Sequence, residues 1–439
     1  MRKLAWCALL GIMGSAACQP LVQSKATSED MSQLFDPPAS NPVIANFDPL
    51  AGILPFPTNL IFSGTTDGTL NAPVVDPNDY ADPAVAMNTL DGYSGIATAY
   101  TSFSGSIDAS TVIAGDTVRV FEVALEGFFL TASSVIRELQ APDALLGIAG
   151  DYTVQVIPQA QIGADGNPTG LTYDTVAVVP TTALPADSSY VVVLTTNILD
   201  LQGRQVKRDL IYNIAQMKET LLNEAGQSQL GLPASNFDDS SAQALEPLRE
   251  LVSSFETVVA QYGIPSSSVA VSWAYTIASD SLMLDVISSE MTATTIEAGP
   301  VIVDPATLAI ADTSLAGFAG TADIYVGTLE VPFYLNPDDP AAGFWMGLQN
   351  QFPTKFYYAA GGRGPMQRST EVVPLMITVP NANSGCTKPA EGWATTLFVH
   401  TNTQDRSNVL ALADAFSTPS APGANDCVVG IGMDLPVSG

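Results

Sequence analysis

The chain has 439 residues, of which 44 are acidic and 15 are basic, and its formal net charge is −29 at pH 7. A chain this acidic is repelled by the phosphates of nucleic acids and by anionic membrane surfaces, which excludes nucleic acid as an expected partner. The length exceeds what a single hydrophobic core usually supports, so we expect two or three domains.

Residues 1–17 are predicted to be a signal peptide. Two basic residues precede an apolar stretch and four small residues, and Cys18 follows directly, which is the order of a bacterial export signal. A cysteine at this point is the residue that lipoprotein processing modifies, and several acyl chains hold a protein firmly on a membrane. We therefore expect lipidation of Cys18, with Gln19 after it favouring the outer membrane or cell surface. The alternative is plain secretion, because Ser15 stands where lipoprotein signals usually carry Leu.

Residues 18–42 are polar, with little hydrophobic periodicity, and are predicted to form a lipidated flexible tether. Between residues 43 and 210 the sequence changes to short apolar runs that Gly, Pro, Asn and Asp separate. This pattern is typical of many short strands and predicts a β-rich domain of immunoglobulin-like type. Strands are expected at residues 117–123, 153–157, 175–179 and 190–195.

Residues 211–320 are expected to form a helical and mixed connecting region. Apolar residues recur at spacings of three and four, which predicts a helix. Because proline is tolerated only in the first turn, Pro247 places the helix start near Ala244 or Leu245, and Gly263 ends the helix. The apolar stripe, interpreted as a packing face, consists of Leu245, Leu248, Val252, Phe255, Val259 and Tyr262.

Residues 321–439 show a third pattern, in which apolar strands alternate with one helix. Strands are expected at 323–331, 372–379, 394–399 and 427–433, with a helix at 405–416. Strand, helix, strand with nearly continuous apolar strands is typical of a parallel sheet that is covered on both faces. The expected fold class of the whole chain is therefore mixed, with a β-sandwich and a helical segment followed by this sheet.

The chain has four cysteines. Cys7 lies in the signal peptide and Cys18 is the expected lipid site, so Cys386 and Cys427 remain in a compartment where disulfides persist. We expect them to be joined. Two cysteines without neighbouring histidines do not form a tetrahedral metal site, and neither a metal nor a cofactor is expected. Acidic loops at 76–79 and 336–339 leave calcium open, without a defined order of ligands.

Three segments together resemble the bacterial virulence-factor lipases, a family of extracellular lipases and surface lysophospholipases that are often lipoproteins. The first is Asn46-Phe47-Asp48-Pro49-Leu50-Ala51-Gly52-Ile53-Leu54-Pro55-Phe56-Pro57-Thr58-Asn59-Leu60. The second is Tyr325-Val326-Gly327-Thr328-Leu329-Glu330-Val331-Pro332-Phe333-Tyr334-Leu335. The third runs from Leu397-Phe398-Val399-His400 through Gln404-Asp405-Arg406 to Asp434-Leu435-Pro436. The resemblance implies an immunoglobulin-like and helical amino-terminal part that leads into an α/β-hydrolase domain, incomplete here over residues 321–439. It also implies a lipid or phospholipid substrate.

In such a hydrolase, the strand that ends at His400 leads into the oxyanion loop, where a His-Gly pair lets backbone amides approach the developing negative charge. Here the pair is His400-Thr401, and the β-branched Thr401 stands where close backbone approach is needed. The family tends to have a second His-Gly after Asp-Leu-Pro, where this chain has Ser438-Gly439. These two departures indicate a degenerate copy of the site.

No catalytic residue is expected within this chain. The nucleophile of the fold lies in a G-x-S-x-G motif, but the three pairs of glycines at that spacing enclose Thr66, Pro168 and Trp345. The catalytic acid and histidine follow the serine in chain order and would lie beyond Gly439. Two hypotheses remain open. The chain is the amino-terminal portion of an exported lipase or lysophospholipase, or it is a catalytically inactive surface lipoprotein that binds or displays something.

Overall fold

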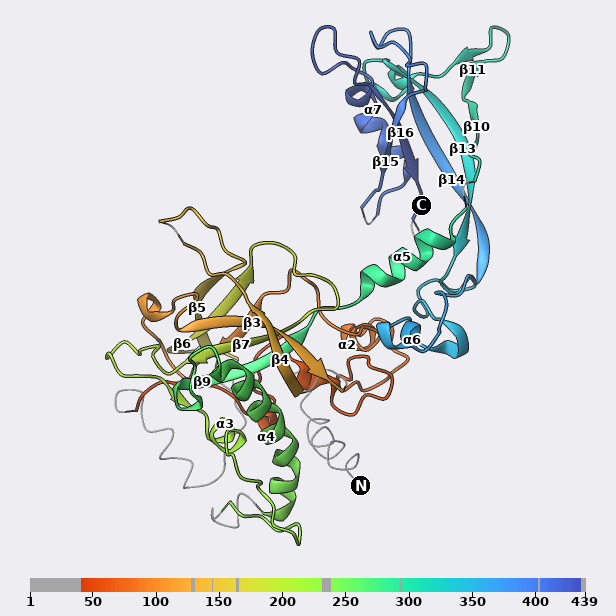
Figure 1. Cartoon of the computed structure of the whole chain (residues 1–439). Coiled ribbons are helices and arrows are strands. Elements are labelled where there is room, and N and C mark those ends of the chain that lie inside the picture. The colour runs from red at the N-terminus through yellow and green to blue at the C-terminus, as the bar shows by residue number, and fades with distance from the viewer. Residues whose placement is uncertain are drawn as a thin grey trace. The chain divides into compact units, whose positions relative to one another are not determined.

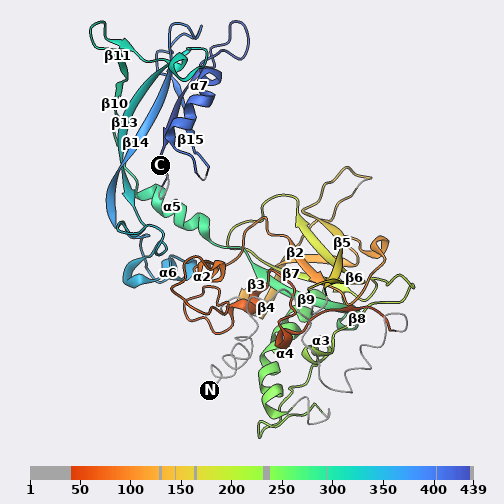
Figure 2. The ribbon, with the colours of Figure 1, turned by 180° about the vertical axis from the view of Figure 1, so that it is seen from behind.

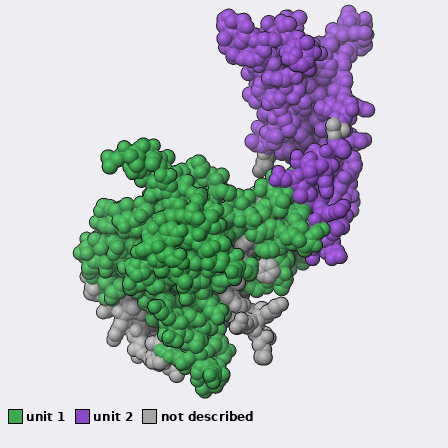
Figure 3. Space-filling view, in the orientation of Figure 1, with its two compact units in different colours: residues 1–284, 354–361 green, residues 285–353, 362–439 purple. Residues whose placement is uncertain are grey.

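Figure 1 shows a computed structural model of the chain, which describes residues 41–127, 131–143, 145–162, 166–230, 238–292, 294–401 and 403–435. The described part is mixed, with most of its regular structure in strands of several sheets and with few helices. It divides into two compact units (Figure 3), Met1–Leu284 with Thr354–Gly361 and Asp285–Pro353 with Gly362–Gly439. The signal peptide, Cys18 and the tether up to residue 40 lie outside the described residues.

The first unit is built on two antiparallel sheets. The larger has the order β4-β3-β7-β9, and the smaller has the order β2-β6-β5. Every residue of β7 and of β9 is buried, so both faces of the larger sheet are covered at these two strands. The strands are β2 (Ala99–Ser102), β3 (Val118–Glu126), β4 (Thr131–Glu138), β5 (Tyr152–Ile162), β6 (Pro168–Pro180), β7 (Ser189–Thr195) and β9 (Val269–Thr276).

One hydrophobic core joins the two sheets to two helices, α3 (Leu210–Ala215) and α4 (Asp239–Ala260). Helix α4 lies against β4 and β9 (Figure 2), and its stripe residues from Leu245 to Val259 are buried. Tyr262, predicted as the last residue of the stripe, lies beyond the end of the helix and is 38% exposed. The remaining short elements of this unit are a parallel pair of β1 (Ile44–Ala45) and β8 (Lys207–Arg208), the helix α2 (Pro83–Met87) and four 3-10 turns, η1 (Pro49–Ala51), η2 (Asn59–Phe62), η3 (Ala109–Thr111) and η4 (Ser266–Ser268).

Helix α4 begins earlier than the sequence predicts. It starts at Asp239 with Asp238 as its N-cap, whose carboxylate accepts the Ser241 N–H at 2.8 Å, and Pro247 lies inside the helix. A proline removes the hydrogen bond to the carbonyl four residues before it, which here belongs to the exposed Gln243. Burial of the stripe on the sheet offsets this loss, so the prediction of a start near Ala244 was wrong.

The second unit contains a five-stranded sheet with the order β10-β13-β14-β16-β15. The sheet is mixed, since only β15 and β16 run parallel and the other neighbours are antiparallel. The sequence pattern predicts a parallel sheet buried on both faces, but β13 and β14 alternate between covered and exposed residues over much of their length, as antiparallel strands with one solvated face do. The strands are β10 (Glu297–Pro300), β13 (Ala322–Phe333), β14 (Ser369–Pro380), β15 (Ala394–Phe398) and β16 (Val428–Met433).

A short helical layer covers one face of β14 and β16. It consists of η7 (Arg406–Val409) and α7 (Leu410–Phe416), which connect β15 to β16. A Cβ atom on Gly432 would lie 2.4 Å from the Arg406 carbonyl oxygen, and one on Gly430 would lie 3.0 Å from Phe416 Cδ2. Only glycine at these positions lets the layer approach the strand this closely.

The segment Thr354–Gly361, which contains α6 (Lys355–Ala359), belongs to the first unit although its flanking residues belong to the second. The buried carboxylate of Asp91 accepts the Lys355 N–H at 2.9 Å and the Ser279 N–H at 2.9 Å. Phe356 packs against Gly68, where any Cβ atom would lie 2.1 Å from the ring. Gly68, one of the glycines at nucleophile-motif spacing, therefore serves packing.

The other described elements are α5 (Asp280–Glu290), β11 (Ile302–Asp304), β12 (Ala309–Ile310), η5 (Thr313–Ala316) and η6 (Leu348–Asn350). Within the described part of the chain, no helix is both long enough and apolar enough to span a bilayer.

Candidate functional site

The candidate site lies at the carboxyl ends of β15 and β16. Because these strands are parallel and adjacent, with Phe398 paired to Gly432, the segments that follow them meet at the same edge of the sheet. The segment after β15 is the His400 loop, residues 399–401 and 403–405, and the segment after β16 is Asp434–Leu435. The structure thus brings together the two parts of the third resembling segment, up to Leu435.

His400 connects these two segments. Its side chain is buried, and its Nε2 accepts the Leu435 N–H at 3.2 Å. Nε2 must therefore be unprotonated, so the proton lies on Nδ1, which donates to the Thr401 carbonyl oxygen at 2.9 Å. Both ring nitrogens are engaged within the protein. In this arrangement His400 holds the loop in place and is not available as a base.

Thr401 also has an internal partner. Its N–H donates to Gln404 Oε1 at 3.3 Å. An oxyanion hole needs backbone amides that point at the developing charge without a partner of their own. The amide of Thr401 does not meet this requirement in the described arrangement, although the side chain itself is exposed.

An ion pair ties the start of the connecting layer to the segment that follows β16. The guanidinium of Arg406 pairs with Asp434, and the Arg406 N–H donates to the same carboxylate at 2.9 Å. Asp405 and Asn408 form a capping box, in which the Asp405 carboxylate accepts the Ser407 N–H at 2.7 Å. The hydrogen bond from the Ser407 hydroxyl lowers the pKa of Asp405 below its usual value. Hydrogen bonds therefore fix the start of this layer, and they favour the charged form of Asp405.

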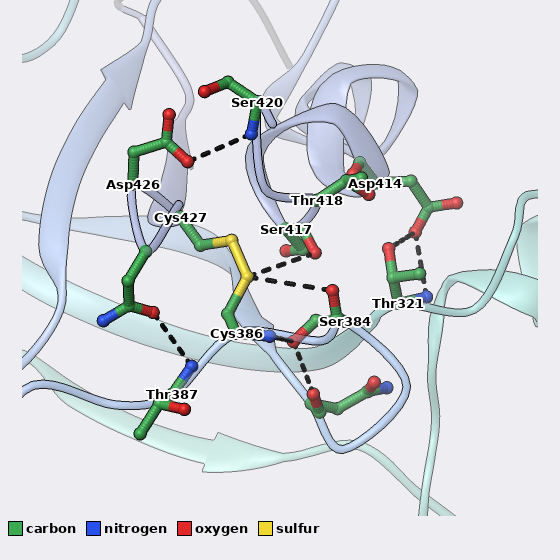
Figure 4. Close-up of a disulfide and its surroundings, with 12 residues drawn as sticks. Thr321, Ser384, Cys386, Thr387, Asp414, Ser417, Thr418, Ser420, Asp426 and Cys427 are labelled. Carbon is green, nitrogen blue, oxygen red and sulfur yellow. Dashed lines mark hydrogen bonds between the residues drawn. A yellow bond between two sulfur atoms is a disulfide. The ribbon is translucent and has the colours of Figure 1, made fainter. Parts of the chain in front are cut away.

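The predicted cysteine pair forms a disulfide in the structure. Cys386 and Cys427 are bonded, with their Cα atoms 6.3 Å apart and a sequence separation of 41 residues. Figure 4 shows that the bond lies beside Ser417 at the end of α7, whose carbonyl oxygen is 3.8 Å from Cys386 Sγ. The disulfide ties the loop before β15 to the beginning of β16, on the side of the sheet opposite to the His400 loop along the strands.

Asp414 on α7 is a residue that sequence reasoning missed. Its carboxylate accepts the Thr321 hydroxyl at 2.8 Å and the Thr321 N–H at 3.1 Å (Figure 4). It also accepts the Thr313 hydroxyl at 2.5 Å and the Ala319 N–H. Burial opposes ionisation, but these hydrogen bonds outweigh it and hold the pKa of Asp414 below its usual value. Its partners lie about a hundred residues away in sequence, so no local pattern could have revealed it.

The first unit contains a buried polar cluster that was missed for the same reason. Glu256 on α4 accepts a hydrogen bond from the Tyr212 hydroxyl at 3.1 Å, and it also accepts one from Gln216. The Tyr212 hydroxyl lies 2.8 Å from Ser272 Oγ on β9. Burial raises the pKa of Glu256 above its usual value. The cluster joins α3, α4 and β9, and every member has a partner within the core.

The remaining candidates lie apart from the His400 loop in sequence or outside the described residues. Thr66 lies in a turn after η2, Pro168 begins β6, and Trp345 packs against Tyr334 with the ring centroids 5.6 Å apart. Cys18, Ser438 and Gly439 are not among the described residues. Across the described residues, no group of three or more His, Cys, Asp or Glu side chains is arranged to hold a metal ion.

Comparisons of the chain with protein-family models, with curated proteins and with solved structures found no match.

Proposed function

We propose that the chain is the amino-terminal portion of an exported bacterial hydrolase of lipid carboxylic esters, a lipase or lysophospholipase, and that this portion has no nucleophile of its own. The observation that carries the proposal is the order β13-β14-β16-β15, in which β14 runs antiparallel to both neighbours while β15 and β16 run parallel. The sheet of α/β-hydrolases begins in this order. The strand arrangement supports the resemblance independently of the residues that suggested it.

The position of the His400 loop supports the same proposal. In α/β-hydrolases the nucleophile follows one of the parallel strands, and the oxyanion loop follows a neighbouring parallel strand. Both therefore lie at the carboxyl edge of the sheet. The His400 loop follows β15 at that edge, next to the segment after β16. The finer assignment of residues 321–439 as an incomplete α/β-hydrolase domain rests on these two features together.

In this proposal the first unit is an immunoglobulin-like sandwich that serves as a scaffold. Its two antiparallel sheets share one core, as the sheets of a sandwich do. The substrate is a lipid or phospholipid, and the protein contacts the membrane through an acyl anchor on Cys18, at the outer membrane or cell surface. Nucleic acid is not a partner, because the net charge is −29.

A second candidate function is a catalytically inactive surface lipoprotein that binds or displays a ligand. The engagement of both His400 ring nitrogens and of the Thr401 amide favours it, because these groups are the ones that an oxyanion loop would keep free. Both candidates predict that this chain alone does not hydrolyse lipid esters. They differ only in what the gene encodes after the codon for Gly439.

Reading the genomic sequence downstream of that codon separates the candidates. The hydrolase proposal expects a continuing frame with G-x-S-x-G, and the longer product should hydrolyse lysophospholipid. Replacing the motif serine by alanine should abolish this hydrolysis. A stop codon directly after Gly439 in the genome would refute the hydrolase proposal and leave the inactive lipoprotein.

The anchor is tested separately. Growth with labelled palmitate should mark the wild-type protein, and the Cys18→Ser variant should lose the label and leave the membrane fraction. Label that persists on the variant would rule out Cys18 as the lipid site without bearing on the hydrolase proposal.

A further inference from the structure

The second unit has a small projecting hairpin that the proposed function does not use. Strands β11 and β12 pair antiparallel, with Ile302 opposite Ile310 and Asp304 opposite Ala309, and residues 305–308 form the turn. Figure 1 shows the hairpin projecting from the end of the five-stranded sheet. Two strands this short bury little apolar surface of their own, so the residues at the turn are free to serve another purpose.

Leu308 at the end of this turn has a left-handed backbone, with φ +55°. Glycine or asparagine is the usual residue in this conformation, because a Cβ atom there meets the neighbouring carbonyl oxygen. The other described non-glycine residues with positive φ are Asp187, Gln349, Asn350 and Thr403, all of them polar. Leu308 is the one aliphatic residue among the described positions that bears this strain.

Leu308 is also 70% exposed, and it is not alone. Ile302 is 39% exposed and Val303 is 49% exposed on the same hairpin. The one charged side chain of the hairpin, Asp304, turns back on the turn, where its oxygens accept the Ala306 N–H at 2.9 Å and the Thr307 hydroxyl at 2.7 Å. At Leu308, a strained backbone and an exposed aliphatic side chain both lower the stability of the folded chain. The fold itself requires neither of them.

The charge around the hairpin restricts what could cover it. No Lys, Arg or His occurs between Arg249 and Lys355 in the sequence, and the acidic residues Asp304 and Asp312 lie in or beside the hairpin. The hairpin itself therefore repels anionic headgroups and carries no side chain that attracts them. An uncharged or zwitterionic surface is therefore the lipid surface that the hairpin fits.

The small apolar surface of the hairpin argues against a protein partner. Three exposed aliphatic side chains cover far less than the roughly 1,000 Å² that a specific protein interface needs. A lipid interface has no such threshold, because each apolar group that leaves water contributes independently. A small contact suffices when a second attachment, such as an acyl anchor, already holds the protein near the membrane.

We propose that the hairpin formed by residues 302–310 inserts Leu308, Val303 and Ile302 into the surface of a zwitterionic lipid layer. This inference rests on the proposed function in that it gives the lipid-directed protein a contact with its substrate phase. It places no residue in a catalytic role. Leu308 enters the apolar layer first, because it stands at the turn and is the most exposed of the three.

The test measures binding of the full chain to vesicles of diether phosphatidylcholine, by flotation. The ether bonds prevent ester hydrolysis, so failure of binding and failure of the hydrolase proposal are distinguishable. The protein carries Cys18→Ser to remove any acyl chain. Leu308→Asn should reduce the partition coefficient about tenfold, as expected for withdrawing one largely exposed leucine from the lipid, while its thermal midpoint should equal or exceed that of the parent because asparagine suits the left-handed backbone.

Two further variants sharpen the result. Val303→Thr, which changes shape little, should also weaken binding, whereas Leu201→Asn in the first unit should leave binding unchanged, because Leu201 is similarly exposed, at 66%, but lies far from the hairpin in sequence. Vesicles with half diether phosphatidylglycerol should bind less protein. Absence of binding to phosphatidylcholine, equal binding by Leu308→Asn, equal loss with Leu201→Asn, or a lowered thermal midpoint of Leu308→Asn would each overturn the proposal.

Discussion

Removing the disulfide tests how the second unit is held together. Among the described residues, the hydrophobic core cluster of β14 and β16 contains three buried side chains, those of Leu375, Ile377 and Val429. A core this small leaves the unit dependent on its cross-link. Replacing both Cys386 and Cys427 by alanine frees the loop that the bond closes and changes little else in the packing.

The expected loss of stability follows from the length of the loop that the disulfide closes. The bond closes a segment with a sequence separation of 41 residues, and in the chain-entropy model such a constraint contributes about 4 kcal/mol to the free energy of unfolding. The loss should appear in the second unit, because both cysteines belong to it. Strand β7 of the first unit, which is buried throughout, should keep its protection.

Hydrogen exchange read by mass spectrometry measures both units in one sample. In the double alanine variant, amides of β14 and β16 should exchange at least a hundredfold faster, while those of β7 should be unchanged. Wild-type protein kept in reductant is the matched control and should behave like the variant. Unchanged exchange in β16, in either sample, would refute the view that the cross-link stabilises this sheet.

Three further predictions concern single residues. Burial raises the pKa of Asp209 to about 6. The contribution of protonated Asp209 to the free energy of unfolding is therefore full below pH 4 and is lost as the pH rises through 6. Asp209→Asn, which keeps an oxygen for the Ile211 N–H, should therefore stabilise the chain by about 1–2 kcal/mol at pH 8, after allowance for solvent screening, and not at pH 4 in urea titrations. An equal gain in stability at pH 4 and at pH 8 would contradict the predicted direction of the pH dependence. Asp414→Ala should cost about 2 kcal/mol and open the 313–321 segment to proteolysis, whereas Asp426→Ala, which loses the exposed bonds to Ser420, should not. His400→Ala should leave the Leu435 N–H without its acceptor, cost about 1–2 kcal/mol and speed exchange of that amide. Unchanged exchange there would refute the bridging role of His400.

The strands of the first unit could be predicted from the sequence because their side chains alternate or are wholly apolar. β3 and β7 lie where the pattern indicates, within a few residues at each end. The start of α4 could not be predicted from the local rule for proline. Tertiary burial of the apolar stripe outweighs the single hydrogen bond that Pro247 removes, and no property of the residues near Pro247 reports that burial.

The candidate site was predictable only in part. The sequence places His400 after a strand, but the partner of its Nε2 is a backbone amide 35 residues away, and only the parallel pairing of β15 and β16 brings the two together. The role of Asp91 depends on Lys355, which is 264 residues away. Interactions of this kind are consequences of topology, and the order of strands in the second sheet was not visible in the apolar pattern of each strand.

The most direct test of the central claim, that this chain carries a hydrolase-type sheet without a nucleophile, is reaction of the purified full chain with a fluorophosphonate probe. We predict no stoichiometric labelling, and no hydrolysis of short p-nitrophenyl esters or lysophospholipids above a buffer blank, because the sequence contains no G-x-S-x-G and both His400 nitrogens are engaged. Stoichiometric labelling of one serine that disappears on denaturation would contradict the claim, since it would reveal an activated nucleophile outside the expected motif.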